Sequence, residues 1–156
     1  MNKYIEPIEK WLQENEEWWL NEPEFWLLQY DIVDKMKADN IGMESVPPIL
    51  ELMEKYPLVD FGTPGALTHF IENFSEKNSD WYDNLVVQSV KKCPTVHTVW
   101  LLNRIVNASI EEQKKEYLQI MENIYNNKTL HENIREVAES FLKYHEKTKM
   151  EFGSLN

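Results

Sequence analysis

One pattern occurs twice in the middle of the chain, thirty positions apart, within residues 60–107. The first copy reads PGALTHFIEN and the second reads PTVHTVWLLN. The matching pairs are Pro64/Pro94, Thr68/Thr98, Phe70/Trp100, Ile71/Leu101 and Asn73/Asn103. Each copy opens with a proline, which is favoured in the first turn of a helix, and a second helical segment follows. A helical repeat of this length is typical of stacked helix pairs.

Start and stop signals predict helices on both sides of the repeated segment. Apolar residues recur at helical spacing over 3–20, and the run NEPE at 21–24 indicates a stop and a restart. The stretch 25–36 has apolar residues nearly all round the helix and predicts a central, largely buried helix. Further helices are predicted at 45–56, 64–76, 80–92, 94–107, 109–125 and 130–147.

The chain has only four glycines and no alternating strand pattern longer than a few residues, so we expect an all-α fold. Antiparallel helix pairs stacked as a HEAT-like array are the first prediction, and an irregular helical bundle is the alternative. At 156 residues, one domain spanning 1–156 is expected. It would comprise N-terminal acidic helices (1–56), helix-pair repeats (57–148) and a frayed tail (149–156), and whether 1–56 continue the array stays open.

The formal net charge of −11 is unevenly distributed. Residues 1–80 hold 17 acids and 6 bases, whereas residues 81–156 hold 10 of each. Nucleic acid is therefore not expected as a partner, because a polyanion requires a basic surface. An acidic face favours a basic protein instead. Alternatively, the net charge only keeps the protein soluble.

The remaining compositional signals indicate a cytoplasmic protein without disulfides. Cys93 is the single cysteine, so neither an internal disulfide nor a cysteine-based metal set is possible. The N-terminus lacks the apolar stretch of a signal peptide, and no apolar run reaches membrane-spanning length. We expect no membrane association, and the oligomeric state stays open.

No catalytic or metal-binding set is predicted, and no cofactor. His69 and Glu72 have a spacing that can hold a metal, but a di-metal carboxylate bundle needs this motif twice and two further glutamates. His97 has no acid three or four positions downstream. A small helical enzyme or metal-binding protein using His69, Glu72 and His97 is kept as an alternative, as is a structural adaptor.

Two groups of residues are candidates for binding a protein partner. The first is an acidic cluster around a tryptophan at the first helix turnover: Glu14, Glu16, Glu17, Trp18, Glu22 and Glu24. Trp18 falls off the apolar stripe that takes Trp11 and Trp19, so it is either exposed as a binding hot spot or packed on the second helix.

The second candidate group lies in the repeats: His69, Glu72, Asn73, His97 and Asn103. These residues would line the concave face of a stack. In the alternative reading, the matched Asn73 and Asn103 hydrogen-bond neighbouring repeats and are structural.

The segments DFGTPGALTHFIENF and PTVHTVWLLNRIVN resemble parts of small bacterial all-helical proteins that include immunity proteins of polymorphic-toxin and contact-dependent inhibition systems. The resemblance covers about residues 57–107 and transfers no defined site residue. It implies a cytoplasmic protein that binds and neutralises a cognate toxin domain, often a basic nuclease. The expected function is therefore a non-enzymatic protein-binding module, most concretely an immunity protein.

Overall fold

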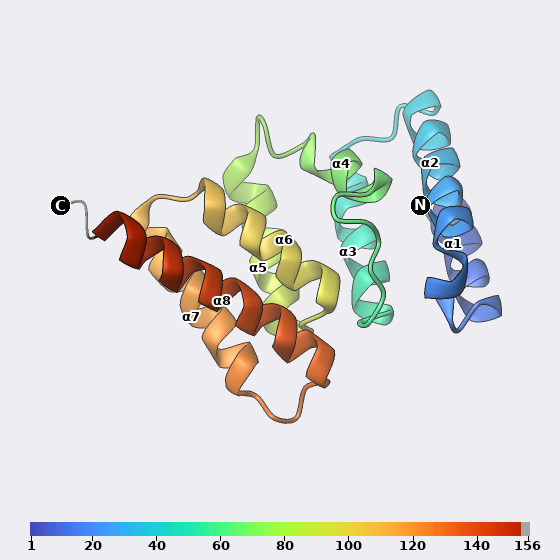
Figure 1. Ribbon diagram of the computed structural model, residues 1–156. Coiled ribbons are helices and arrows are strands. Elements are labelled where there is room, and N and C mark those ends of the chain that lie inside the picture. The colour runs from blue at the N-terminus through green and yellow to red at the C-terminus, as the bar shows by residue number, and fades with distance from the viewer. Residues whose placement is uncertain (154–156) are drawn as a thin grey trace.

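The computed structural model describes the backbone of residues 1–153 and the side chains of residues 1–151. Within that range the chain forms eight α-helices and two short 3-10 helices, with no β-strand (Figure 1). The α-helices are α1 (Asn2–Glu14), α2 (Glu22–Ala38), α3 (Val46–Lys55), α4 (Ala66–Glu72), α5 (Ser79–Lys92), α6 (Val96–Ala108), α7 (Glu111–Asn126) and α8 (Glu132–Gly153). The 3-10 helices are η1 (Trp18–Asn21) and η2 (Met43–Ser45). The predicted all-α class is confirmed.

Several helices that follow one another in the chain pack as pairs (Figure 1). The helices α1 and α2 pair at the N-terminal end, α5 and α6 form an antiparallel pair in the middle, and α7 and α8 form another at the C-terminal end. Between these pairs, α3 contacts α1, α5 and α6, and the short α4 packs against α2. The HEAT-like stack stays a prediction, and the irregular bundle is compatible with this arrangement.

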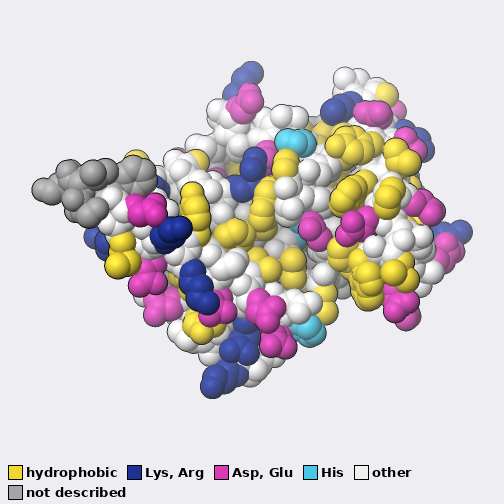
Figure 2. Space-filling model, in the orientation of Figure 1, with side chains coloured by type: hydrophobic (Ala, Val, Ile, Leu, Met, Phe, Trp, Pro, Cys, Tyr) yellow, Lys and Arg dark blue, Asp and Glu magenta, His cyan; other side chains and the backbone are white. Residues whose placement is uncertain are grey.

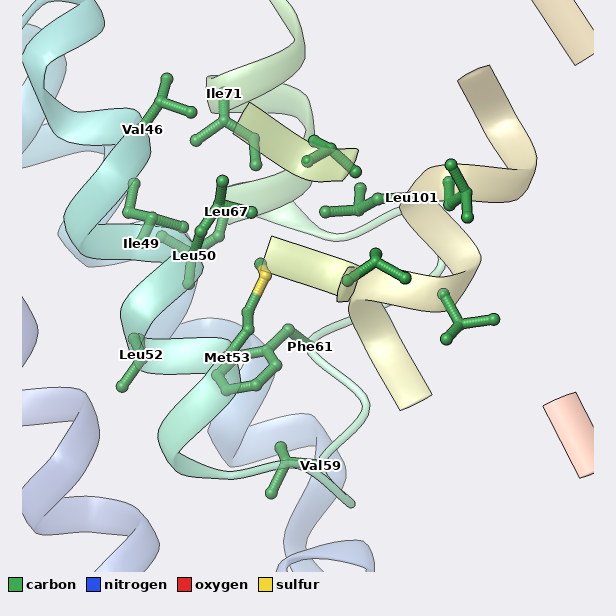
Figure 3. Packing of buried hydrophobic residues seen from close by; sticks show 14 of the residues in the cluster. Val46, Ile49, Leu50, Leu52, Met53, Val59, Phe61, Leu67, Ile71 and Leu101 are labelled. Atoms are coloured by element: carbon green, nitrogen blue, oxygen red, sulfur yellow. The ribbon is translucent and has the colours of Figure 1, made fainter. Parts of the chain in front are cut away.

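The helices α3, α4 and α6 meet in the centre of the hydrophobic core (Figure 3). Their buried side chains there include Val46, Ile49, Leu50, Leu52 and Met53 from α3, Leu67 and Ile71 from α4, and Leu101 from α6. Phe61, from the segment before α4, is fully buried and lies 5.8 Å from the Phe25 ring of α2. One cluster of buried apolar side chains therefore joins the first helices to the repeated segment.

The predicted first helix over 3–20 is wrong at its C-terminal end, because α1 stops at Glu14. The Asn15 side chain donates to the Trp11 carbonyl (2.9 Å), a local hydrogen bond that competes with helix continuation. The next four-residue element is the 3-10 helix η1. Trp19 therefore does not continue the stripe of Trp11, and it is 54% exposed.

The prediction that residues 25–36 form a largely buried helix is also wrong. One face of α2 is buried, through Phe25, Gln29, Ile32, Val33 and Met36. The opposite face exposes Trp26, Leu27 and Tyr30. Helix α2 lies at the N-terminal edge and packs mainly against α1, η1 and α4, and these three side chains stay largely exposed.

Several predicted helix ends also differ from the structure. Helix α4 begins at Ala66 and not at 64, so residues 60–65 form a loop. The predicted helix 109–125 begins later, at Glu111, and the Ser109 hydroxyl donates back to the Ile105 carbonyl (2.6 Å) at the end of α6. Helix α8 continues to Gly153, through the predicted start of the tail. Residues 154–156 of that tail lie outside the described residues.

Candidate protein-binding surface

Five large apolar side chains of η1 and α2 are exposed to solvent, and we call them the α2 patch. Their exposed fractions are 54% for Trp19, 67% for Leu20, 40% for Trp26, 66% for Leu27 and 53% for Tyr30. Figure 2 shows hydrophobic side chains gathered on the right-hand side of the molecule, where Figure 1 draws α1 and α2. Single exposed apolar residues are common on protein surfaces, but adjacent aromatic and aliphatic side chains are typical of interaction sites.

Helical spacing explains how the α2 patch forms. Trp26, Leu27 and Tyr30 are separated by one, three and four positions, so they share a face of α2. The buried residues Phe25 and Gln29 lie on the other face and hold the helix against the core. The patch is therefore presented on a regular helix whose opposite face fixes its position.

The segment that carries the α2 patch is rich in acids, and helical spacing places one base, Lys37, on the same face of α2, seven positions after Tyr30. From Trp11 to Asp34 the chain contains no Lys, Arg or His, and its acids are Glu14, Glu16, Glu17, Glu22, Glu24, Asp31 and Asp34. Glu16, Glu17 and Leu20 line a shallow hollow of about 540 Å³ next to η1. Glu14 pairs with Lys10, whose Nζ lies 3.9 Å from Glu14 Oε1. Glu22 and Glu24 lie in the first turn of α2, where negative charge complements the helix dipole, so these two acids stabilise the helix.

Trp18 adopts the packed alternative. Its side chain is half-buried, with its ring 6.3 Å from Phe25 of α2 and in edge contact with Trp19 at 6.1 Å. Trp19 is the more exposed ring of the pair. Glu24, another predicted member of the acidic cluster, accepts a hydrogen bond from the Trp11 indole (3.1 Å). Of the predicted acids, Glu14, Glu16 and Glu17 line the hollow next to η1 together with Leu20, whereas Glu22 and Glu24 do not line it.

The second predicted surface separates into exposed and buried residues. His69, Glu72 and Asn73 line an open hollow of about 700 Å³ between α4, α5 and α6. In that hollow Arg104 pairs with Glu72 through two hydrogen bonds, one of which (Nη2 to Oε2) is 2.9 Å long. This pairing raises the pKa of Arg104. Burial raises the pKa of the Tyr82 phenol, which also lines the hollow.

The other two members of that surface, His97 and Asn103, are buried. Asn103 is 8% exposed, and its Oδ1 accepts a hydrogen bond from His145 Nε2–H of α8 (2.7 Å). Burial lowers the pKa of His145. Asn103 therefore joins two helices, as in the structural reading, whereas its sequence match Asn73 is exposed.

His97 fastens the loop 60–65 to the body of the protein. It is 1% exposed, and its Nδ1 accepts the Phe61 N–H (3.3 Å) while its Nε2–H donates to Thr68 Oγ1 (2.9 Å). His97 Nδ1 also lies 3.6 Å from Asp60 Oδ1. This Asp60–His97–Thr68 chain has the order of a nucleophile triad, but Thr68 is fully buried, so no substrate reaches its hydroxyl.

Two opposing effects act on the pKa of Asp60. Burial raises it, but hydrogen bonding to the carboxylate, including that from the Gly62 N–H to Asp60 Oδ1 (2.8 Å), outweighs burial and lowers the pKa overall. The Gly62 contact holds for either tautomer of His97, since the N–H belongs to the main chain. Asp60 is consequently a fixed carboxylate at the edge of the loop.

The sequence reasoning did not single out the exposed members of the α2 patch or Gln29. A helix that is apolar nearly all round is either enclosed by the protein or in contact with something outside it. The run from Trp11 to Asp34, with seven acids and no base, was the available signal that favoured the second possibility.

Comparison with protein-family models, with curated protein sequences and with solved structures finds no match to this chain. Among the described residues, no three or more His, Cys, Asp or Glu side chains are grouped so that they could hold a metal ion. No helix in that part of the chain is both long and apolar enough to span a membrane.

Proposed function

We propose that this protein is a non-enzymatic protein-binding module and that its α2 patch binds a basic protein. The observation that carries the proposal is the set of five exposed large apolar side chains on η1 and α2, within a segment (11–34) that holds seven acids and no base. Tryptophan and tyrosine are enriched among residues that dominate binding energy, and two tryptophans and one tyrosine belong to the patch. The acidic rim supplies charge complementarity to a cationic partner.

The most concrete form of this proposal is an immunity protein that binds and neutralises a cognate, basic toxin domain in the cytoplasm. The resemblance of residues 57–107 to immunity proteins supports it. The charge distribution agrees, because the acidic excess lies in the half of the chain that carries the α2 patch. An acidic surface steers a basic partner and accelerates their encounter, which suits a protein that must intercept a toxin quickly.

The test is capture of the partner from the native cells by the immobilised full chain, with washes at low and then high salt. The bound proteins are identified, and the captured protein is produced separately for affinity measurements. We expect a basic protein whose retention weakens with salt. Its expression alone should harm the cell, and co-expression of this chain should relieve the harm.

A matched pair of variants decides whether the α2 patch is responsible. Leu27→Ser removes a patch side chain that is 66% exposed, and Ile110→Ser makes a similar change at a side chain that is 67% exposed outside the patch. Leu27→Ser should weaken binding by about tenfold or more, while Ile110→Ser leaves it unchanged. An empty capture, an acidic partner or equal effects of the two variants would refute the proposal.

A further inference from the structure

A pocket of about 470 Å³ opens beside the α2 patch, between α2 and the loop 60–65. This volume lies in the range of roughly 300–1,000 Å³ that is common for ligand pockets. The lining from α2 consists of Glu22, Trp26, Gln29 and Tyr30, and the lining from the loop side consists of Asp60, Gly62, Thr63, Pro64, Gly65 and Ala66. Trp26 and Tyr30 thus belong both to the patch and to the pocket.

Gln29 is the buried polar group of this pocket. Its side chain is 1% exposed, and neither its amide nitrogen nor its amide oxygen has a hydrogen-bond partner among the described residues. Buried side-chain amides are nearly always hydrogen-bonded, and leaving one unpaired lowers stability. Nothing in the packing of α2 requires an amide at this position, since its neighbours Ile32 and Val33 are apolar. A ligand of the pocket would supply the missing partner.

The charge of the pocket indicates the kind of ligand. Its lining includes two carboxylates, Glu22 and Asp60, and no Lys, Arg or His. The Glu22 carboxylate makes no hydrogen bond or ion pair with any described residue. The exposed rings of Trp26 and Tyr30 lie on the same face of α2. Carboxylates beside aromatic rings favour a cation that also has flat apolar faces.

We propose that this pocket binds a guanidinium group, presented by an arginine of the basic protein partner. This inference rests on the proposed function. Arginine suits the pocket better than lysine because its planar guanidinium stacks on aromatic rings and donates several hydrogen bonds at once. Its donors meet the Glu22 and Asp60 carboxylates and the Gln29 amide oxygen. Main-chain carbonyls of the same partner segment accept from the Gln29 amide nitrogen.

The loop wall of the pocket is held in place before any ligand arrives. The Phe61 N–H donates to His97, and Asp60 Oδ1 accepts the Gly62 N–H. Gly62 has a φ of +96°, and a Cβ at Gly65 would overlap the Phe61 carbonyl oxygen. The loop therefore reaches its position only with glycine at these two places. A wall fixed in this way loses little conformational entropy on binding.

The test uses two small probes and the full-length protein labelled with nitrogen-15. N-acetyl-arginine N-methylamide carries the guanidinium, and N-acetyl-citrulline N-methylamide has nearly the same shape without the charge. Each probe is titrated while the NMR signals of the Trp26 indole N–H and the Gln29 side-chain amide are followed. We expect saturable shifts of both signals with the arginine probe, with a dissociation constant on the order of millimolar. The citrulline probe should bind about tenfold more weakly or worse.

Variants check that the shifts come from this pocket. Glu22→Gln removes one carboxylate and should weaken the arginine probe about tenfold, the size of one lost charge-assisted hydrogen bond. Glu122→Gln makes the same change at an exposed position of α7 and should leave the affinity unchanged. The inference would be overturned by equal binding of both probes, by the absence of a saturable shift, or by shifts of other signals while those of Trp26 and Gln29 stay unchanged.

The result separates this inference from the proposed function. If Leu27→Ser abolishes partner capture but the arginine probe fails to bind, the guanidinium site is wrong and the binding function stands. If the probe binds as expected but Leu27→Ser leaves partner capture unchanged, the proposed function is wrong and the arginine site stands.

Discussion

Replacing Gln29 by methionine should make the protein more stable. Methionine matches glutamine closely in length, and both residues have similar helix propensity, so α2 itself is not perturbed. The substitution removes two buried polar atoms that have no hydrogen-bond partner among the described residues. Each unpaired buried group costs about 1–3 kcal/mol, and the sulfur and methyl group that replace them have no such requirement. Allowing for imperfect packing, we expect the free energy of unfolding to rise by about 1–3 kcal/mol.

Urea unfolding followed by far-UV circular dichroism measures this change, because all regular structure in the described residues is helical. A rise in the midpoint with an unchanged slope reports stability alone. Thermal unfolding should shift upward by roughly 2–4 °C for each kcal/mol in a chain of this size. The control is Gln113→Met on an exposed face of α7, which should stay within about 0.5 kcal/mol of the wild type.

A loss of more than about 1 kcal/mol in Gln29→Met would refute the reasoning, because it would mean that the amide makes a favourable hydrogen bond in solution. The same variant should bind the arginine probe more weakly than the wild type does. Higher stability together with lower affinity distinguishes a residue retained for binding from one retained for packing.

Three further substitutions test the loop, the hollow and the pH dependence. Gly65→Ala should lower the free energy of unfolding by about 2 kcal/mol or more in urea titrations, because the new Cβ would overlap the Phe61 carbonyl oxygen. The control is Gly42→Ala, whose Cβ meets only the end of a flexible side chain and should change the free energy of unfolding by less than about 1 kcal/mol. Tyr82→Phe should raise the free energy of unfolding by about 1 kcal/mol, because the buried hydroxyl has no partner; a loss of that size would show that it has one. Folding lowers the pKa of Asp60, so the wild type should have a higher free energy of unfolding than Asp60→Asn above about pH 4. This difference should disappear as the pH falls below that value. A difference in unfolding midpoint that is the same at every pH would contradict this prediction.

The helical class was predictable from the sequence because apolar periodicity and the scarcity of glycine act locally. The limits of the helices were less predictable. Asn15 ends α1 through a hydrogen bond to Trp11, and Ser109 donates its hydroxyl to Ile105 and not to α7. Both side chains have competing hydrogen-bond partners nearby in the chain, and the residue pattern alone does not predict which hydrogen bond forms.

The candidate site was predictable in charge but not in shape. The acids around Glu16 and Glu17 were identified from their position in the chain, and Trp18 takes one of its two predicted alternatives by packing near Phe25. Trp19, which was predicted on the apolar stripe of the first helix, is exposed because α1 ends at Glu14. In the repeats, the matched Asn73 and Asn103 are exposed and buried respectively. Burial depends on which helices pack against each copy, and neighbours distant in sequence, such as α8 at Asn103, decide it.

The two walls of the pocket differ in how freely they can change over evolution. Trp26 and Tyr30 are exposed, so their replacement alters what the pocket recognises at little cost to folding. The opposite wall tolerates no side chain at Gly62 or Gly65. If the partner changes during evolution, substitutions should therefore accumulate at the exposed positions of α2, while the glycines of the loop 60–65 are retained. Such a chain carries its specificity on one helix face, which can diverge between close relatives while the scaffold behind it stays the same.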